Sequence, residues 1–516
     1  MAPSCQILEK FHGNSDPPYL DGDGYVSFRP NDADDPRNWS TARCWVITFS
    51  ATLLAMNANF ASSAPSACIE SISETFGVSK VAAGLTTTLF LLGFCAGSLI
   101  VAPLSEFKGR KWIFYVTFLL YITFTFLCAF APNFASLLVG RFITGVLVSS
   151  PLSNTPGVIS DIWYACQRGN AVALFSAMTW LGTALGPVVG GFMELKKDWR
   201  WTFYVLLWLG GGSALFLLLI PETHGPTILR WKAQGYRKSG KPAYKTVRAK
   251  AEDTDPSLVE IYKVALTRPW ILLFDTISLL CAIYISLVIT LYYMLFDVYS
   301  IVFQERRGWN AGVGQLPLLG IIVGAVVGGI IVALDTRRMQ KKAHAKGLMP
   351  DQLEPEERLV LGVVGGIIFA ISMFWFAWSA EYKSVHWIVP TIAGSFLSMA
   401  MLLIFVAYIN YLMDTYLLYA ASAIAANTIA RFACSAAAPL FTKQMFGALG
   451  VGGGGSLIGG VAVILTAIPF LFWKYGRILR LKSKYATARD VSGKDQKDGW
   501  HDGDPTRYNT EEPEEV

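Results

Sequence analysis

The sequence predicts an all-α membrane protein whose twelve transmembrane helices form two six-helix bundles. Three observations lead to this fold class. The 516 residues are 53% hydrophobic and only 16% charged, whereas about a quarter of the residues in a soluble globular protein are charged. Apolar stretches of roughly the 20 residues that a bilayer crossing needs recur along the chain. One long basic connection divides these stretches into two sets of six.

Each apolar stretch is a predicted membrane helix. The first six stretches are 44–66, 81–104, 112–131, 136–160, 169–193 and 200–221. The second six are 269–296, 311–334, 359–380, 385–410, 417–442 and 453–474. The chain then divides into a disordered tail at 1–43, a bundle at 44–221, a central loop at 222–268, a second bundle at 269–474 and a tail at 475–516.

Basic residues predict the orientation of the bundles. They collect in the connections after the second, sixth and eighth stretches and after the last one. By the positive-inside rule, both termini and the central loop are expected in the cytosol. Because the net charge of +6 resides in these connections, we expect no nucleic-acid partner. The eight scattered cysteines include no CxxC pair, so we expect free thiols rather than a metal site.

The fifth stretch contains the most informative pattern, Gly-x-x-x-Gly-Pro-x-x-Gly-Gly. Glycines four residues apart lie on one helical face and let a neighbouring backbone approach closely, and a proline in the same helix bends it. A static small-residue interface is the alternative reading. The complete pattern resembles the antiporter signature of the drug:proton antiporters in the major facilitator superfamily. Its residues are Gly182, Gly186, Pro187, Gly190 and Gly191.

The turn at 102–111 resembles the signature loop between the second and third helices of that superfamily. Glu106 stands where the family has Asp, and Phe107 replaces a basic residue. An acid at a helix end can bond helix N-termini and pair with basic side chains, which predicts a latch that holds one conformational state; a simple positive-inside anchor is the alternative. An acid followed by basic residues recurs after the eighth stretch. The latch residues are Glu106, Lys108, Gly109, Arg110, Lys111, Asp335, Arg337 and Arg338.

Charged residues inside apolar stretches are candidates for proton coupling, because charge at bilayer depth is costly and marks function. Arg141, with Gly145, resembles the R-x-x-x-G signature that is implicated in proton handling; an interfacial arginine is the alternative. In the seventh stretch, Asp275 is the preferred coupling carboxylate, with a structural pairing as the alternative. Asp297 is expected at the rim.

Aromatic and polar residues of the seventh and eleventh stretches suit an amphipathic ligand. The expected cavity residues are Tyr284, Tyr292, Tyr293, Asn427 and Arg431. Together with W-R-W-T-F-Y at 199–204 and R-L-K-S-K-Y at 480–485, these segments extend the resemblance to fungal twelve-helix drug:proton antiporters over nearly the whole chain.

The resemblance implies the major facilitator fold and a proton-coupled exporter of a drug, toxin or secondary metabolite that works by alternating access. Polyamine transport and uptake symport on the same fold are alternatives, and a non-transporting membrane sensor is an alternative from another class. We expect no enzyme activity, cofactor or metal, with the proton gradient as the energy source. The expected partners of this monomer are a small organic substrate, protons and the bilayer, in the plasma membrane or the vacuolar membrane.

Overall fold

The computed structural model describes the chain with gaps, as residues 18–22, 24–164, 168–239, 244, 246–253, 258–346, 354–416, 419–483 and 485–486. Within these residues the regular structure is helical, apart from one isolated bridge between Leu20 and Val26. Ten helical stretches in the described part are long and apolar enough to cross a membrane. The predicted all-α fold class is confirmed.

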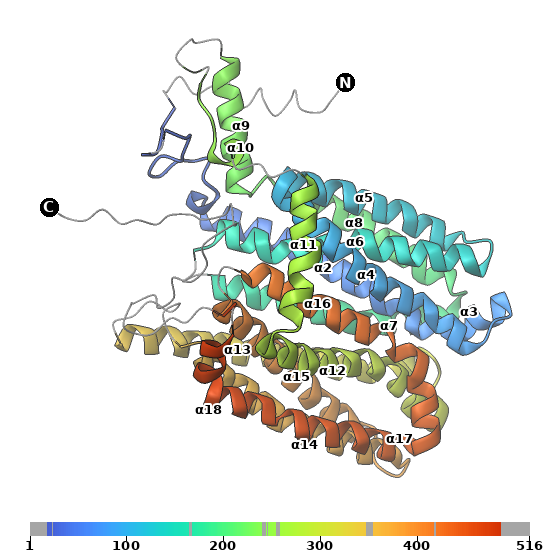
Figure 1. Ribbon diagram of the computed structural model, residues 1–516. Coiled ribbons are helices and arrows are strands. Elements are labelled where there is room, and N and C mark those ends of the chain that lie inside the picture. The colour runs from blue at the N-terminus through green and yellow to red at the C-terminus, as the bar shows by residue number, and fades with distance from the viewer. Residues whose placement is uncertain are drawn as a thin grey trace.

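Two helical bundles lie side by side, the first in the upper half of Figure 1 and the second in the lower half. The first consists of α2 (Thr41–Ser63), α4 (Lys80–Lys108), α5 (Arg110–Ala129), α6 (Phe134–Ile162), α7 (Arg168–Lys196) and α8 (Arg200–Leu217). Between α2 and α4 lie the 3-10 turn η2 (Ala64–Cys68) and α3 (Ile69–Phe76). The second bundle consists of α12 (Thr276–Tyr299), α13 (Leu319–Ala345), α14 (Leu359–Glu381), α15 (Ile388–Thr415), α16 (Ala420–Ala436), α17 (Ala438–Leu465) and α18 (Ala467–Lys482).

Local chemistry sets several helix ends. Ser79 accepts a hydrogen bond from the backbone N–H of Ala82 at 3.1 Å and begins α4, while Asn133 and Ser136 form a capping box at the start of α6. Gly109 ends α4 with a φ of 91°, a conformation that favours glycine. The break between α4 and α5 therefore follows from the sequence of the turn.

The last two crossings differ from their predicted ranges, 417–442 and 453–474. Gly450 has φ 71° and ψ 172° and interrupts α17. The eleventh crossing is accordingly α16 followed by the first part of α17, and the chain returns through the rest of α17 and α18 (Figure 1). Gly450 falls inside the predicted connection at 443–452, so the reversal lies where hydropathy placed it, and the helices extend beyond the predicted ends of both ranges.

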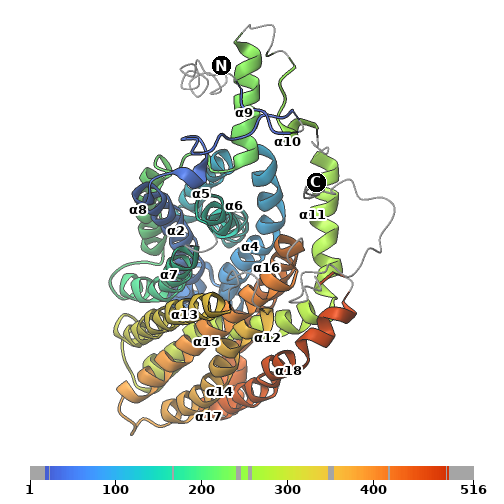
Figure 2. The ribbon, with the colours of Figure 1, turned by 90° about the vertical axis from the view of Figure 1, so that its left-hand side faces the viewer.

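The connection between the bundles contains α9 (Gly225–Lys238), α10 (Lys250–Asp253) and α11 (Leu258–Leu273). α9 projects from one end of the bundles, and α11 runs beside both bundles and packs on α4 and α16 (Figures 1 and 2). We call the end with α9 the tail face, because residues 18–40 also lie there, and the end with α3 the far face.

The described part of the N-terminal tail packs on α9, although its polar composition predicted disorder. Val26 forms a small apolar cluster with Ala233, Val247 and Ala249. Lys232 of α9 forms ion pairs with Asp32 at 2.7 Å and Asp34 at 2.9 Å. This part of the tail is thus held by apolar and charged partners that lie some 200 positions further along the chain.

Candidate functional site

The glycine face of α7 lies against α2 and η2, inside the first bundle. A Cβ at Gly186 would collide with Ser63 Oγ and lie 2.8 Å from the backbone nitrogen of Ala64. A Cβ at Gly182 would collide with the carbonyl oxygen of Met56. The Ser63 hydroxyl also donates to the carbonyl oxygen of Thr183 at 2.7 Å. Side-chain-free positions therefore permit backbone-to-backbone packing here, next to the buried Pro187.

The same helix meets the second bundle. A Cβ at Gly191 would lie 2.6 Å from the carbonyl oxygen of Ala311, which precedes α13. Nearer the middle of α7, the Trp180 and Tyr292 rings lie 4.3 Å apart. The Tyr292 hydroxyl donates to the carbonyl oxygen of Trp180 at 3.1 Å. α7 is thus packed against α2 on one side and against α13 and the turn η5 (Val313–Leu318) before it on another. It reaches α12 through Trp180 and Tyr292.

Other predicted cavity residues also lie at contacts between helices. The hydroxyls of Tyr293 and Ser62 lie 3.0 Å apart and join α12 to α2. Tyr284 packs against Tyr408 within the second bundle, with ring centroids 5.4 Å apart. Asn427 is fully buried, and its amide donates to Ser278 Oγ at 3.2 Å, joining α16 to α12.

Arg141 is 1% exposed and lies within α6. Its guanidinium donates to the carbonyl oxygens of Thr86 and Ala61, each at 3.0 Å, and lies 4.0 Å from the centroid of the Phe90 ring. The arginine therefore bonds α4 and α2 from α6. These acceptors are neutral dipoles, so its charge is solvated without a described counter-ion.

Arg431 lies half-buried on α16 between two aromatic rings. Its guanidinium carbon is 5.2 Å from the centroid of Phe405 and 5.0 Å from that of Phe432. Phe432 in turn meets Phe94 of α4 edge-on at 5.3 Å. Arg431 therefore lies next to the seam between the two bundles.

The two acidic candidates of the seventh stretch lie near opposite ends of α12. Asp275 occupies the N-cap position at the tail face, where its carboxylate accepts hydrogen bonds from Tyr416 and, at 2.9 Å, from Ser483. Asp297 is 5% exposed and lies one turn beyond Tyr293. Across the described residues, no hydrogen bond or ion pair reaches the Asp297 side chain; the charged groups that act on it are Lys443 and Glu305.

Two acidic residues that the sequence did not predict as partners bind the turn at 102–111. Arg110 Nε lies 2.5 Å from Asp161 Oδ2, at the end of α6. The Glu222 carboxylate accepts the backbone N–H groups of Arg110 and Lys111 at 3.0 and 3.2 Å. Burial raises the pKa of Glu222, and its backbone hydrogen bonds oppose this rise. The sequence signal was available, since both acids lie at the tail-face ends of apolar stretches.

Among the other latch residues, Glu106 is close enough to Arg110 and Asp161 to interact electrostatically with both. The side chains of Glu106, Lys108 and Arg337 are exposed at the tail face. Arg338 lies 3.6 Å from Asp335 within α13. The second bundle has its own ion pairs at this face, including Arg480 with Glu356 at 2.8 Å. The two predicted latch halves are therefore separate clusters in this state.

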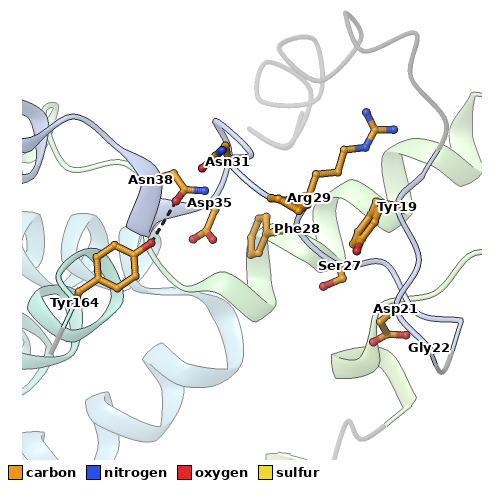
Figure 3. A pocket seen from close by; sticks show the side chains of 11 residues that line it. Tyr19, Asp21, Gly22, Ser27, Phe28, Arg29, Asn31, Asp35, Asn38 and Tyr164 are labelled. Atoms are coloured by element: carbon orange, nitrogen blue, oxygen red, sulfur yellow. Dashed lines mark hydrogen bonds between the residues drawn. The ribbon is translucent and has the colours of Figure 1, made fainter. Parts of the chain in front are cut away.

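An open pocket of about 600 Å³ lies at the tail face, away from the bundle seam (Figure 3). The Tyr164 hydroxyl donates to Asn38 Oδ1 at 3.3 Å on one side, and Tyr19 and Ser27 lie on the other (Figure 3). Its lining comes from the tail and from Tyr164, so it is distinct from the residues between the bundles.

Comparison with known proteins agrees with this architecture. The family model described as Major Facilitator Superfamily matches residues 47–439. Efflux pump FUB11 of Gibberella moniliformis is 40% identical over 465 residues, which cover 89% of this chain and 77% of that protein. The major facilitator superfamily multidrug transporter mdrA of Aspergillus fumigatus is 36% identical over 495 residues, covering 94% and 79%.

The fold is also that of a solved transporter. The structure of the proton:xylose symporter XylE superposes with a TM-score of 0.60 at 17% identity, covering 85% of this chain and 96% of that one. This chain is a multi-pass membrane transporter rather than an enzyme, and it belongs to the major facilitator superfamily, among the fungal efflux pumps of that family.

Proposed function

We propose that the protein exports an amphipathic organic compound across the plasma membrane in exchange for protons, by alternating access, with both termini in the cytosol. The observation that carries this proposal is the packing of α7. Its glycine face has no room for a side chain against α2, while Gly191 and Trp180 contact the second bundle. A displacement of one bundle is therefore transmitted to α2 through a tightly packed helix that also contacts the other bundle.

The hydrogen bonds to α12 and α16 support a state that opens toward the tail face beside these helices, while α7 and α13 stay in contact there through Gly169 and Thr336. Among described residues, the hydrogen bonds between the first-bundle helices and α12 or α16 fall in the middle or in the far-face half of the helices. They join Ser62 with Tyr293, Thr88 with Ala436 at 2.7 Å, Cys95 with Ile429 at 3.9 Å, and Trp180 with Tyr292. With the tail face in the cytosol, this is the state that loads a compound for export.

A proton moving inward would drive the return to this state. The membrane potential supplies about 2.3 kcal/mol per charge per 100 mV, in addition to the pH difference. Asp275 and Asp297 are the candidate carriers, and Arg141 between α2 and α4 is the candidate that links proton binding to bundle movement. Asp297 is the more deeply buried acid and has no hydrogen bond or ion pair among the described residues. An ionisable side chain inside a membrane protein marks a functional site.

Proteoliposomes that contain the full-length protein test this proposal. An imposed pH difference should drive uphill flux of an amphipathic dye, and abolishing the gradient should stop accumulation. Replacement of the carrier, by Asp275→Asn or by Asp297→Asn, should abolish coupling while dye binding persists. If dye flux through the wild-type protein does not depend on the pH difference, proton coupling is refuted. Accumulation in the same direction as proton flow would establish uptake symport instead.

A further inference from the structure

The space around Tyr293 has positive charge on both sides. Tyr293 is close enough to Arg141 of α6 and to Arg431 of α16 to interact electrostatically with both. The groups that act electrostatically on the two arginines are Tyr121, Cys128 and Tyr293, and no carboxylate is among them. Arg141 lies inside the first bundle and Arg431 lies next to the seam, and no described acid balances either guanidinium group.

The two arginines differ in how their hydrogen-bonding capacity is used. Arg141 donates to two carbonyl oxygens and is almost fully buried. Arg431 has only ring contacts among the described residues, with no hydrogen bond or ion pair to its guanidinium. Its nitrogens are not among the buried atoms that lack a partner, so they reach accessible space. Arg431 is the arginine that remains available to a ligand.

The chemistry of this site selects an anion. An uncompensated charge inside a membrane protein is costly, so an arginine at such a site pairs with an acid, bonds backbone carbonyls or faces a cavity. Arg141 bonds carbonyls, whereas Arg431 has no such bond among the described residues and can take an acidic ligand. The planar guanidinium fork matches a carboxylate, to which it can donate two parallel hydrogen bonds. A polyamine or another organic cation would instead meet two positive charges.

The surroundings of Arg431 select the rest of the ligand. The Phe405 and Phe432 rings flank the guanidinium, and Phe94 and Tyr293 continue the aromatic surface toward the first bundle. Aromatic rings bind flat apolar groups by stacked or edge-on contacts. We infer that Arg431 binds the carboxylate of an aromatic organic anion, whose apolar body lies along these rings. This inference rests on the proposed export function and names its substrate class.

The test uses three probes of the same shape: 1-naphthoate, the neutral 1-naphthamide and the cationic 1-naphthylmethylamine. Binding to the purified full-length protein is measured at pH 7 without a gradient. We expect naphthoate to bind more tightly than the other two. Arg431→Gln should weaken naphthoate binding by about 10- to 150-fold and leave naphthamide binding nearly unchanged. Arg431→Lys should retain part of the preference, because it keeps the charge but loses the fork.

The matched control is Lys197→Gln, which removes one positive charge from an exposed position at the far face. It should retain the naphthoate preference. Equal binding of the three probes, or an equal loss of naphthoate and naphthamide in Arg431→Gln, would overturn the inference. Because binding needs no gradient, a protein that selects naphthoate but shows no proton-driven flux would refute the proposed function and leave the anion site intact.

Discussion

Arg110 has both its side chain and its backbone held by acids from other parts of the first bundle. Asp161 lies at the end of α6, 51 positions away, and Glu222 follows α8, 112 positions away. The Arg110 side chain is about one-tenth exposed and that of Asp161 is 17% exposed. Removing one partner from a buried ion pair leaves an uncompensated charge, which costs more than removing both.

We therefore expect non-additive losses of stability at this pair. Arg110→Gln and Asp161→Asn should each destabilise the purified protein by about 3–5 kcal/mol. The double variant should lose less than the sum of the two, with a coupling energy of about 1–3 kcal/mol. Thermal unfolding in detergent measures all four proteins. If the loss of stability in the double variant equals the sum of the two single losses, the interaction between Arg110 and Asp161 contributes nothing to stability.

His224 gives the tail face a pH-dependent contact. Burial and the nearby Arg110 charge lower the pKa of His224 to about 4. Its ring Nδ1 lies 2.9 Å from Thr227 Oγ1, in the first turn of α9. Because the folded state binds its proton less readily than the unfolded state does, the His224 contribution to stability is complete above pH 6.5 and is lost as the pH falls toward 4.

Hydrogen exchange of the α9 amides, corrected for intrinsic rates, should detect this loss. Protection in the wild-type protein should fall between pH 6.5 and 4.5 relative to His224→Gln, which lacks the titrating group. Glu222 titrates nearby in both proteins, so the difference between them isolates the histidine. If α9 protection falls with pH equally in the wild-type protein and in His224→Gln, the pH dependence does not come from His224.

At the scale of the element, α7 combines a helix-bending proline with a face that excludes side chains. An added methyl group at Gly186 meets Ser63 and the backbone of η2, so the two elements must separate. Gly211 of α8 offers a matched control, because nothing lies within 4 Å of the position that its Cβ would occupy.

We expect Gly186→Ala to slow transport and to lower the melting temperature. Overpacking of this kind costs about 1–3 kcal/mol. Gly211→Ala should leave transport unchanged and should be neutral or stabilising by up to about 1 kcal/mol, because alanine favours the helix. Both variants are compared by proteoliposome flux and thermal unfolding. A harmless Gly186→Ala would mean that α7 does not need its close approach to α2.

For the whole molecule, conformational equilibrium depends on contacts that exist in one state only. The hydrogen bond between Tyr293 and Ser62 joins the bundles near the far face. Tyr293→Phe removes it and keeps the ring contact with Phe296. A typical intramolecular hydrogen bond contributes about 0.5–1.5 kcal/mol, so the population open to the far face should rise about 2- to 12-fold.

This equilibrium can be measured as the distance between two spin labels at the far face. Suitable exposed positions are Thr75 on α3 and Gln444 on α17. A larger fraction of long distances is expected in Tyr293→Phe than in the wild-type protein. Tyr284→Phe is the control, because Tyr284 lies within the second bundle against Tyr408. An unchanged distance distribution would show that this bond does not bias the equilibrium.

The sequence by itself determined the all-helical class, the order of the apolar stretches, the break at Gly109 and the glycine pattern of α7. These features are local, because hydropathy, helical spacing and the conformational preferences of glycine and proline can be read along the chain. The family followed from the same local motifs.

The tertiary structure alone decided which residues meet. It paired Arg110 with Asp161 and Glu222, packed the described part of the tail on α9, and placed Asp275 beside Tyr416 and Ser483. It also distinguished Arg141, which bonds two carbonyl oxygens, from Arg431, whose guanidinium has ring contacts but no hydrogen bond among the described residues. Each of these outcomes depends on how helices far apart in sequence pack together, and hydrophobic patterning specifies that a face is buried without specifying its neighbour.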